Sequence, residues 1–152
     1  SGGTLYNRIC VAVRRLASRG ITPATTNVTF AIVWAQGESD TGTTSLAYQA
    51  ALDRIQARAV ECGFSGRFFV NVETWLCAGG VNATNATIQG AQAAVVDGVK
   101  FWAGFDADTL TAAGGNRQAD CGGVAGTHFN DTGIAAFANG IANAMHASGA
   151  PF

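Results

Sequence analysis

One of the two histidines of the chain, His128, has a type and a position that suit acid–base chemistry. It stands in Gly126-Thr127-His128-Phe129, directly before a stretch with helical periodicity. An imidazole titrates near about 6.5, so His128 is suited to take the proton of a hydroxyl nucleophile at neutral pH. The alternative is a structural role at the entry to the last helix. Other polar residues follow short apolar runs: Gln36, Glu38 and Asp40 after 28–34, Glu73 and Thr74 after 67–72, and Asp106 and Asp108 after 99–103.

The elements that must position these residues alternate between helix and strand. Apolar residues at helical spacing predict helices over about 5–19, 45–62, 83–97 and 131–147. Short apolar runs predict strands over 28–34, 67–72 and 99–103, the first of them buried on both faces, with a small-residue loop through Gly79-Gly80. This is the α/β order, which calls for a parallel sheet covered by helices. Since ligands bind beyond the carboxyl ends of such strands, we expect the polar clusters to gather there.

The composition predicts a single globular domain and excludes several classes of partner. The chain has 152 residues, of which 48% are hydrophobic and 12% charged. No apolar run approaches the ~20 residues that span a bilayer, so we expect no membrane partner. The 9 basic and 10 acidic residues are scattered and leave a net charge of −1, which disfavours nucleic acid. Two isolated histidines, no Cys-x-x-Cys pair and no glycine-rich phosphate loop predict neither metal nor cofactor.

The cysteines and the glycosylation sequons favour an oxidising compartment. Four cysteines allow three disulfide pairings, of which we favour Cys10 with Cys62 and Cys77 with Cys121, because the predicted fold brings those segments together. Asn-x-Ser/Thr sequons begin at Asn27, Asn82, Asn85 and Asn130. We therefore expect a secreted or cell-surface protein.

The segment after the first predicted strand resembles a known signature. Trp34-Ala35-Gln36-Gly37-Glu38-Ser39-Asp40 is similar to the W-x-Q-G-E-S-D element of the SGNH-type carbohydrate esterases, the group of the sialate O-acetylesterases and carbohydrate esterase family six. Further segments resemble other blocks of that family in the same order: Ser1-Gly2-Gly3-Thr4 with Leu5-Tyr6-Asn7-Arg8, then Ile88-Gln89-Gly90-Ala91-Gln92, and Gly126-Thr127-His128-Phe129 with Gly133.

The resemblance implies a flavodoxin-like three-layer sandwich that removes O-acetyl groups from sugars as a Ser-His-Asp hydrolase. Gly3, next to Gly2, would offer a backbone N–H to the developing oxyanion, and Gln36 would offer a side-chain N–H. Each such donor is typically worth ~3 kcal/mol in the transition state.

The same resemblance gives the remaining residues their roles. His128 would take the proton of the nucleophile and return it to the leaving sugar hydroxyl. Glu38 and Asp40 would hold the oxyanion loop in place, because a carboxylate beside the oxyanion would repel it, and Gln92 would support that loop.

Two departures from the family pattern matter. The nucleophilic serine of the family lies upstream of the Gly-Gly-Thr turn, so we expect it outside residues 1–152, which would form a single but incomplete domain lacking the first strand and helix. The triad aspartate of the family lies three residues before the histidine, where this chain has Ala125. Asp120 could fold back to the imidazole through the glycines, a backbone carbonyl could orient the ring instead, or Asp131 could, although its place at a helix start suits an N-cap.

These observations predict a carbohydrate O-acetylesterase whose partners are an acetylated sugar and an upstream segment of the same polypeptide that carries the serine. The chain by itself would then be nearly inactive. The alternative is a carbohydrate-binding or structural module that kept the fold and lost the chemistry.

Overall fold

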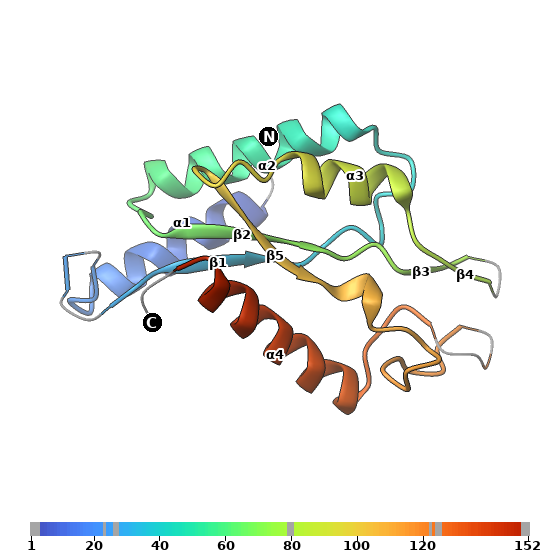
Figure 1. Cartoon of the computed structure of the whole chain (residues 1–152). Coiled ribbons are helices and arrows are strands. Elements are labelled where there is room, and N and C mark those ends of the chain that lie inside the picture. The colour runs from blue at the N-terminus through green and yellow to red at the C-terminus, as the bar shows by residue number, and fades with distance from the viewer. Residues whose placement is uncertain are drawn as a thin grey trace.

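The α-helices and the strands of the central sheet follow one another along the chain in the expected order (Figure 1). The computed structural model describes residues 4–22, 24–25, 28–78, 81–121, 123 and 126–149. The helices are α1 (Thr4–Ala17), α2 (Ser45–Glu61), α3 (Ala86–Ala94) and α4 (Asp131–Ala147), and a 3-10 helix, η1, covers Ala107–Thr109. The strands are β1 (Ala31–Trp34), β2 (Arg67–Val72), β3 (Leu76–Ala78), β4 (Val81–Ala83) and β5 (Phe101–Asp106).

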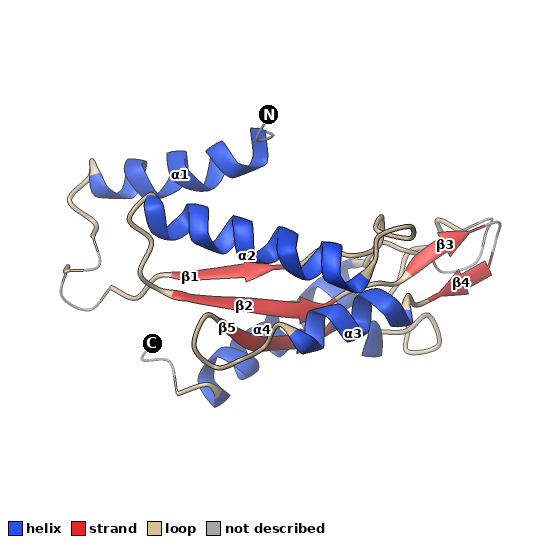
Figure 2. Cartoon of the chain, turned by 90° about the horizontal axis from the view of Figure 1, so that it is seen from above, coloured by secondary structure: helices blue, strands red, loops and turns tan. Residues whose placement is uncertain are grey.

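The central sheet is parallel, as the α/β pattern predicts. Its order is β1-β2-β5, with Ile32 beside Phe68 and Phe68 beside Phe101 in the register. Helices α2 and α3 lie on one side of this sheet and α4 on the other (Figure 1), while α1 runs beside α2 (Figure 2). The chain is therefore an α/β protein in which the carboxyl ends of all three parallel strands lie on the same side of the molecule.

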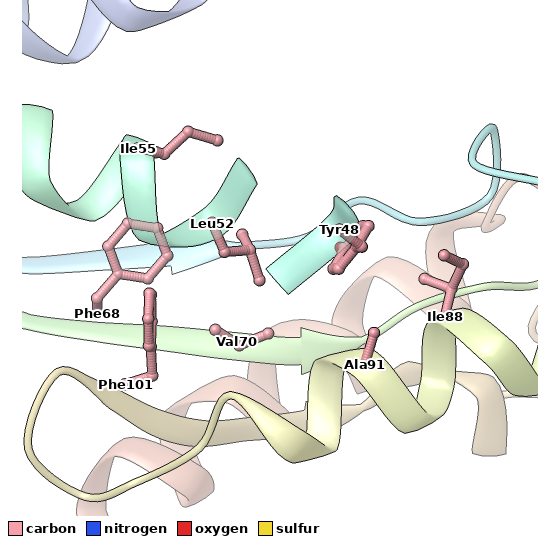
Figure 3. Packing of buried hydrophobic residues seen from close by; sticks show 8 residues of the cluster. All are labelled: Tyr48, Leu52, Ile55, Phe68, Val70, Ile88, Ala91 and Phe101. Atoms are coloured by element: carbon pink, nitrogen blue, oxygen red, sulfur yellow. The ribbon is translucent and has the colours of Figure 1, made fainter. Parts of the chain in front are cut away.

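The core joins the sheet to α2 and α3. Phe68, Val70 and Phe101 point from the strands toward side chains of the two helices, the set being Tyr48, Leu52, Ile55, Ile88 and Ala91 (Figure 3). The rings of Phe68 and Phe101 meet edge to face at 5.2 Å between centroids. Burying each of these rings stabilises the fold by on the order of 2 kcal/mol. This core fixes where the strand ends lie.

Strand β1 differs from the prediction of a strand buried on both faces. Its residues alternate between exposed and half-buried, and Val33 is 36% exposed. The physical reason is its place at the edge of the sheet, whereas α4 packs against β5 at the other edge. The most buried strand is instead the central one, β2, in which the four middle residues, Phe68, Phe69, Val70 and Asn71, are buried.

The predicted loop through Gly79-Gly80 is also wrong in part. Strands β3 and β4 on either side of these glycines pair antiparallel, with Cys77 beside Asn82. Glycine is well suited to connect two such strands, but three-residue strands carry no clear periodic signal. The two glycines themselves lie outside the described residues.

Both favoured disulfides are present and confirm the predicted pairing. Cys10 of α1 is bonded to Cys62 directly after α2, with Cα atoms 5.2 Å apart. Cys77 of β3 is bonded to Cys121 in the long loop before α4, with Cα atoms 5.6 Å apart. Such bonds indicate an oxidising, extracellular environment. Within the described part of the chain, no helix combines the length and the hydrophobicity needed to cross a bilayer.

Candidate active site

Three segments meet beyond the carboxyl ends of the parallel strands, where we expected the polar clusters. They are the loop 35–44 after β1, the segment 73–75 after β2 and the long loop 110–130 between η1 and α4 (Figure 1). The main chain of the first two comes very close at Gly37, where an added Cβ would lie 2.3 Å from the carbonyl oxygen of Glu73. Glycine at position 37 is therefore required by this contact.

The imidazole of His128 is held by Asp120. One carboxylate oxygen of Asp120 is hydrogen-bonded to Nδ1 of His128 and also accepts the backbone N–H of His128 at 3.2 Å. The imidazole side chain is 74% exposed, so the ring remains accessible. Desolvation raises the pKa of Asp120, but hydrogen bonds from His128 and the charge of the imidazolium outweigh it and bring the pKa below the ordinary value. Asp120 is therefore ionised at neutral pH and can hold the proton of His128 on Nδ1.

The loop geometry explains why a residue eight positions away reaches the imidazole. An added Cβ at Gly126 would lie 1.9 Å from a carboxylate oxygen of Asp120, so only glycine permits this close return of the chain. The backbone N–H of Cys77 donates to Oγ1 of Thr127 at 3.0 Å, next to His128. Ala125, at the family position of the aspartate, lies outside the described residues.

Asp131 does not take the N-cap role that its position suggested. It lies in the first turn of α4, and the N-cap is Asn130, whose side chain accepts the N–H of Gly133 at 2.9 Å. The prediction was one residue out of place, because Asp and Asn both suit an N-cap and stand side by side here.

Gln36 is held from both its side chain and its main chain. Its amide Nε2 donates to the carboxylate of Asp40, which also accepts Oγ1–H of Thr43 at 3.3 Å. Its carbonyl oxygen accepts the Tyr48 hydroxyl at 2.6 Å and Nε2 of Gln92 at 2.9 Å. Asp40 and Gln92 thus both form hydrogen bonds with Gln36. The Nε2 group carries a second N–H that Asp40 does not take up.

Glu38 affects the site through its negative charge, which raises the pKa of the buried carboxyl group of Glu73. Glu73 is 6% exposed, and burial, followed by the negative charge of Glu38, raises the pKa of Glu73 to about 7. The positive charge of Arg117 acts in the opposite direction, and Asp108 adds to the increase. Glu73 therefore exchanges its proton close to neutral pH, beside the loop that carries Gln36.

Comparisons with known proteins add no further constraint. No protein-family model, no curated protein and no solved structure matches this chain.

Two buried residues of the site, Tyr48 and Arg117, were not singled out as functional by their sequence positions, and a third, Asp108, was named only among the polar residues that follow the third predicted strand. Tyr48 follows the apolar stripe of α2 and reads as core, yet its hydroxyl accepts from Nε1 of Trp34 at 3.2 Å and donates to Gln36. Asp108 accepts hydrogen bonds from both N–H and Oγ1 of Thr74, from the N–H of Trp75 and from Nε2 of Gln89. The sequence offered one indication that Arg117 is unusual, because it is the only Lys or Arg after Lys100.

The predicted glycine donor of the oxyanion hole has no described position. Gly3 and its neighbour Gly2 lie outside the described residues, so their role as an oxyanion donor stays a prediction. Among the residues that the structure describes, no group of three or more His, Cys, Asp or Glu side chains could hold a metal ion. What the arrangement offers chemically is an exposed imidazole backed by a carboxylate, at the same sheet edge as an anchored amide donor.

Proposed function

We propose that the chain is the larger part of a carbohydrate O-acetylesterase that works as a Ser-His-Asp hydrolase. The observation that carries this proposal is the contact between Nδ1 of the exposed His128 and the carboxylate of Asp120. A carboxylate in that position keeps the proton on Nδ1, so Nε2 is free to accept the proton of a hydroxyl nucleophile. The choice of an acetylated sugar as substrate derives from the resemblance of residues 34–40 to the esterase signature.

The proposed reaction assigns one task to each anchored residue. A serine hydroxyl attacks the acetyl carbonyl while Nε2 of His128 takes its proton, and a side-chain N–H of Gln36 donates to the oxyanion. His128 then returns the proton to the leaving sugar oxygen, which leaves an acetyl-enzyme that water hydrolyses by the same route. Asp40 and Gln92 keep Gln36 in position, and Asp120 stabilises the imidazolium.

The nucleophilic serine of the proposed enzyme lies on another segment of the polypeptide. Among the described residues, no serine hydroxyl is hydrogen-bonded to His128. The described part of the sheet has β1 at one edge, and Gln36 follows that strand directly. We infer that an upstream segment of the same polypeptide adds a strand beside β1 and presents its serine to His128.

The test compares the chain alone with the chain joined to its upstream segment. Release of acetate from p-nitrophenyl acetate and from an acetylated glycan should be near the buffer rate for residues 1–152 and should rise when the upstream segment is present. The variant His128→Gln should lose at least ~10³-fold of that rate. The matched control is His146→Gln, which changes the other histidine, in the last turn of α4, and should keep the activity.

One outcome favours the second candidate, a carbohydrate-binding or structural module without catalysis. Binding of the glycan without acetate release from the completed polypeptide would overturn the esterase proposal and support that module. The tryptophans give this alternative little support, because Trp34 packs against the core while Trp75 and Trp102 stack on Arg117 and Arg67.

A further inference from the structure

Arg117 is almost fully buried in the loop that carries His128, at 4% exposure. Its guanidinium donates to three backbone carbonyls: Nε to Leu110 at 2.7 Å, Nη2 to Ala107 at 3.0 Å and Nη1 to Thr127 at 2.5 Å. Ala107 and Leu110 lie at the end of β5 and η1, whereas Thr127 directly precedes His128. One side chain therefore ties the end of the sheet to the residue before the imidazole.

The residue after the imidazole is held by the same guanidinium. The Cζ atom of Arg117 lies 4.1 Å from the ring centroid of Phe129 and 5.3 Å from that of Trp75. A planar, delocalised cation stacks on aromatic faces and still donates hydrogen bonds in its own plane, which an ammonium group does not do. His128 thus stands between two residues that both contact Arg117.

The main chain around Arg117 sets the distance between His128 and Asp120. Arg117 forms an antiparallel bridge with Phe129, and the N–H of Gln118 donates to the carbonyl of His128 at 2.8 Å. The side chain of Gln118 adds a bond to the carbonyl of Phe129 at 2.7 Å. Asp120 follows two residues later, so this pairing places its carboxylate opposite the ring of His128.

Burying the Arg117 guanidinium costs hydration free energy, and the packing of the loop alone gives no reason to place a cation there. Among the described residues, no carboxylate lies within 4.0 Å of the guanidinium, although Glu73 and Asp108 act on it at longer range. Desolvation lowers the pKa of Arg117, yet a guanidinium stays charged in proteins. A buried charge is tolerated only where hydrogen bonds or an opposite charge compensate for its lost hydration, and the three carbonyl bonds supply that compensation here. What an apolar side chain cannot supply is the set of three directed donors.

We propose that Arg117 is a positioning residue that holds His128 against Asp120 in the geometry required for proton transfer. The proposal rests on the esterase function proposed above, in which His128 is the base. In this role Arg117 acts on the imidazole through its hydrogen bond to the carbonyl of Thr127 and its contact with the ring of Phe129.

The first test needs no catalysis and uses the chain as it is. The ¹⁵N NMR signals of the imidazole report which ring nitrogen carries the proton. For the wild type we expect one neutral tautomer, with the proton on Nδ1; for Arg117→Met and Arg117→Lys we expect a mixture of tautomers. The matched control is Arg67→Met, because Arg67 also stacks on a tryptophan, Trp102 at 5.3 Å, and donates to a backbone carbonyl, that of Ser148 at 2.9 Å, outside this loop.

The second test uses the completed polypeptide and separates kcat from KM. Misplacing the base should lower kcat by roughly 100-fold in Arg117→Met with KM changed by less than about twofold. Arg117→Lys should recover only a small part of the lost kcat, since lysine keeps the positive charge and lacks the planar set of N–H donors. Arg67→Met should keep kcat.

The two tests distinguish a failure of the positioning role of Arg117 from a failure of the esterase function. A folded Arg117→Met variant with the wild-type tautomer would overturn the positioning role. If that variant does not fold, Arg117→Lys decides by the same NMR measurement. If the completed wild type releases no acetate, the esterase proposal fails, while the tautomer measurement still shows whether Arg117 sets the geometry of His128.

Discussion

At the scale of single residues, the carboxyl group of Glu73 couples folding to pH. Burial and the charge of Glu38 raise its pKa to about 7, from an ordinary value of 4.5. The folded protein therefore binds this proton more tightly than the unfolded chain does. The resulting contribution to the free energy of unfolding is fully present below pH 4.5 and is lost as the pH rises to about 7, a change of roughly 3 kcal/mol.

We predict that Glu73→Gln removes this loss of stability, because an amide does not ionise and can still donate to Glu38. Urea unfolding at pH 5 and pH 8 should show a much smaller difference between the two pH values in the variant than in the wild type. The control is Glu61→Gln, which changes an exposed carboxylate paired with Arg58 at the end of α2 and should keep the wild-type pH profile. An unchanged pH profile in Glu73→Gln would mean that Glu73 is already ionised when folded at acidic pH.

Residue types predicted the contacts that chemistry dictates and missed those that depend on distant neighbours. Asp120 was a candidate because the glycines after it could let a carboxylate fold back to the imidazole, and Asp40 was one through the family resemblance; in the structure Asp120 contacts His128 and Asp40 contacts Gln36. Tyr48 lies 44 positions from Gln92 in the sequence, and no local pattern indicates that hydrogen bond. For Arg117 the aromatic partners are 42 and 12 residues away, so its burial could not be read from its neighbours.

At the scale of elements, the two disulfides hold different parts of the fold while closing loops of similar length. They span 52 and 44 residues. In the chain-entropy description, loops of this size contribute about 4 kcal/mol each. Cys77 and Cys121 join β3 to the loop of His128, whereas Cys10 and Cys62 join α1 to the end of α2.

We predict that removing either bond by a pair of Cys→Ala changes lowers the free energy of unfolding by a similar amount, with different local effects. Hydrogen exchange should increase most at Gln118, Gly126 and Asn130 in Cys77→Ala/Cys121→Ala, since these amides carry the hydrogen bonds of that loop. In Cys10→Ala/Cys62→Ala the increase should fall on α1. An identical exchange pattern in the two variants would contradict this assignment of local roles.

The elements that the sequence predicted best are those with both periodicity and a clear start. Helix α4 runs over Asp131–Ala147, as expected, because its apolar stripe follows directly on the Asn130 cap. Helix α3 is shorter than the predicted 83–97, because Asn85 caps its start and the chain leaves the helix after Ala94. The prediction that the strand over 28–34 is buried on both faces was wrong, since an apolar sequence does not show that β1 lies at a sheet edge.

At the scale of the whole molecule, self-association depends both on β1, the edge strand of the sheet that the described residues form, and on the small net charge. Edge strands offer unpaired backbone groups to other chains, and charged side chains on such a strand oppose that pairing. Strand β1 carries no charged residue, and the chain as a whole has a net charge of −1 and an isoelectric point near 6.0. Weak electrostatic repulsion between copies near neutral pH leaves this edge unprotected.

We predict that the isolated chain self-associates through β1 and that Val33→Lys reduces this association. Val33 is 36% exposed, so a lysine can extend into solvent while its charge faces any strand that approaches the edge. Sedimentation velocity over a range of concentrations should show a shift toward monomer. The matched control is Leu46→Lys, at a position 79% exposed on α2, which adds the same charge away from the edge and should leave the association unchanged. Both variants bring the net charge from −1 to 0 and so cannot act by increasing repulsion between copies. An equal reduction in both would therefore mean that the association does not run through β1.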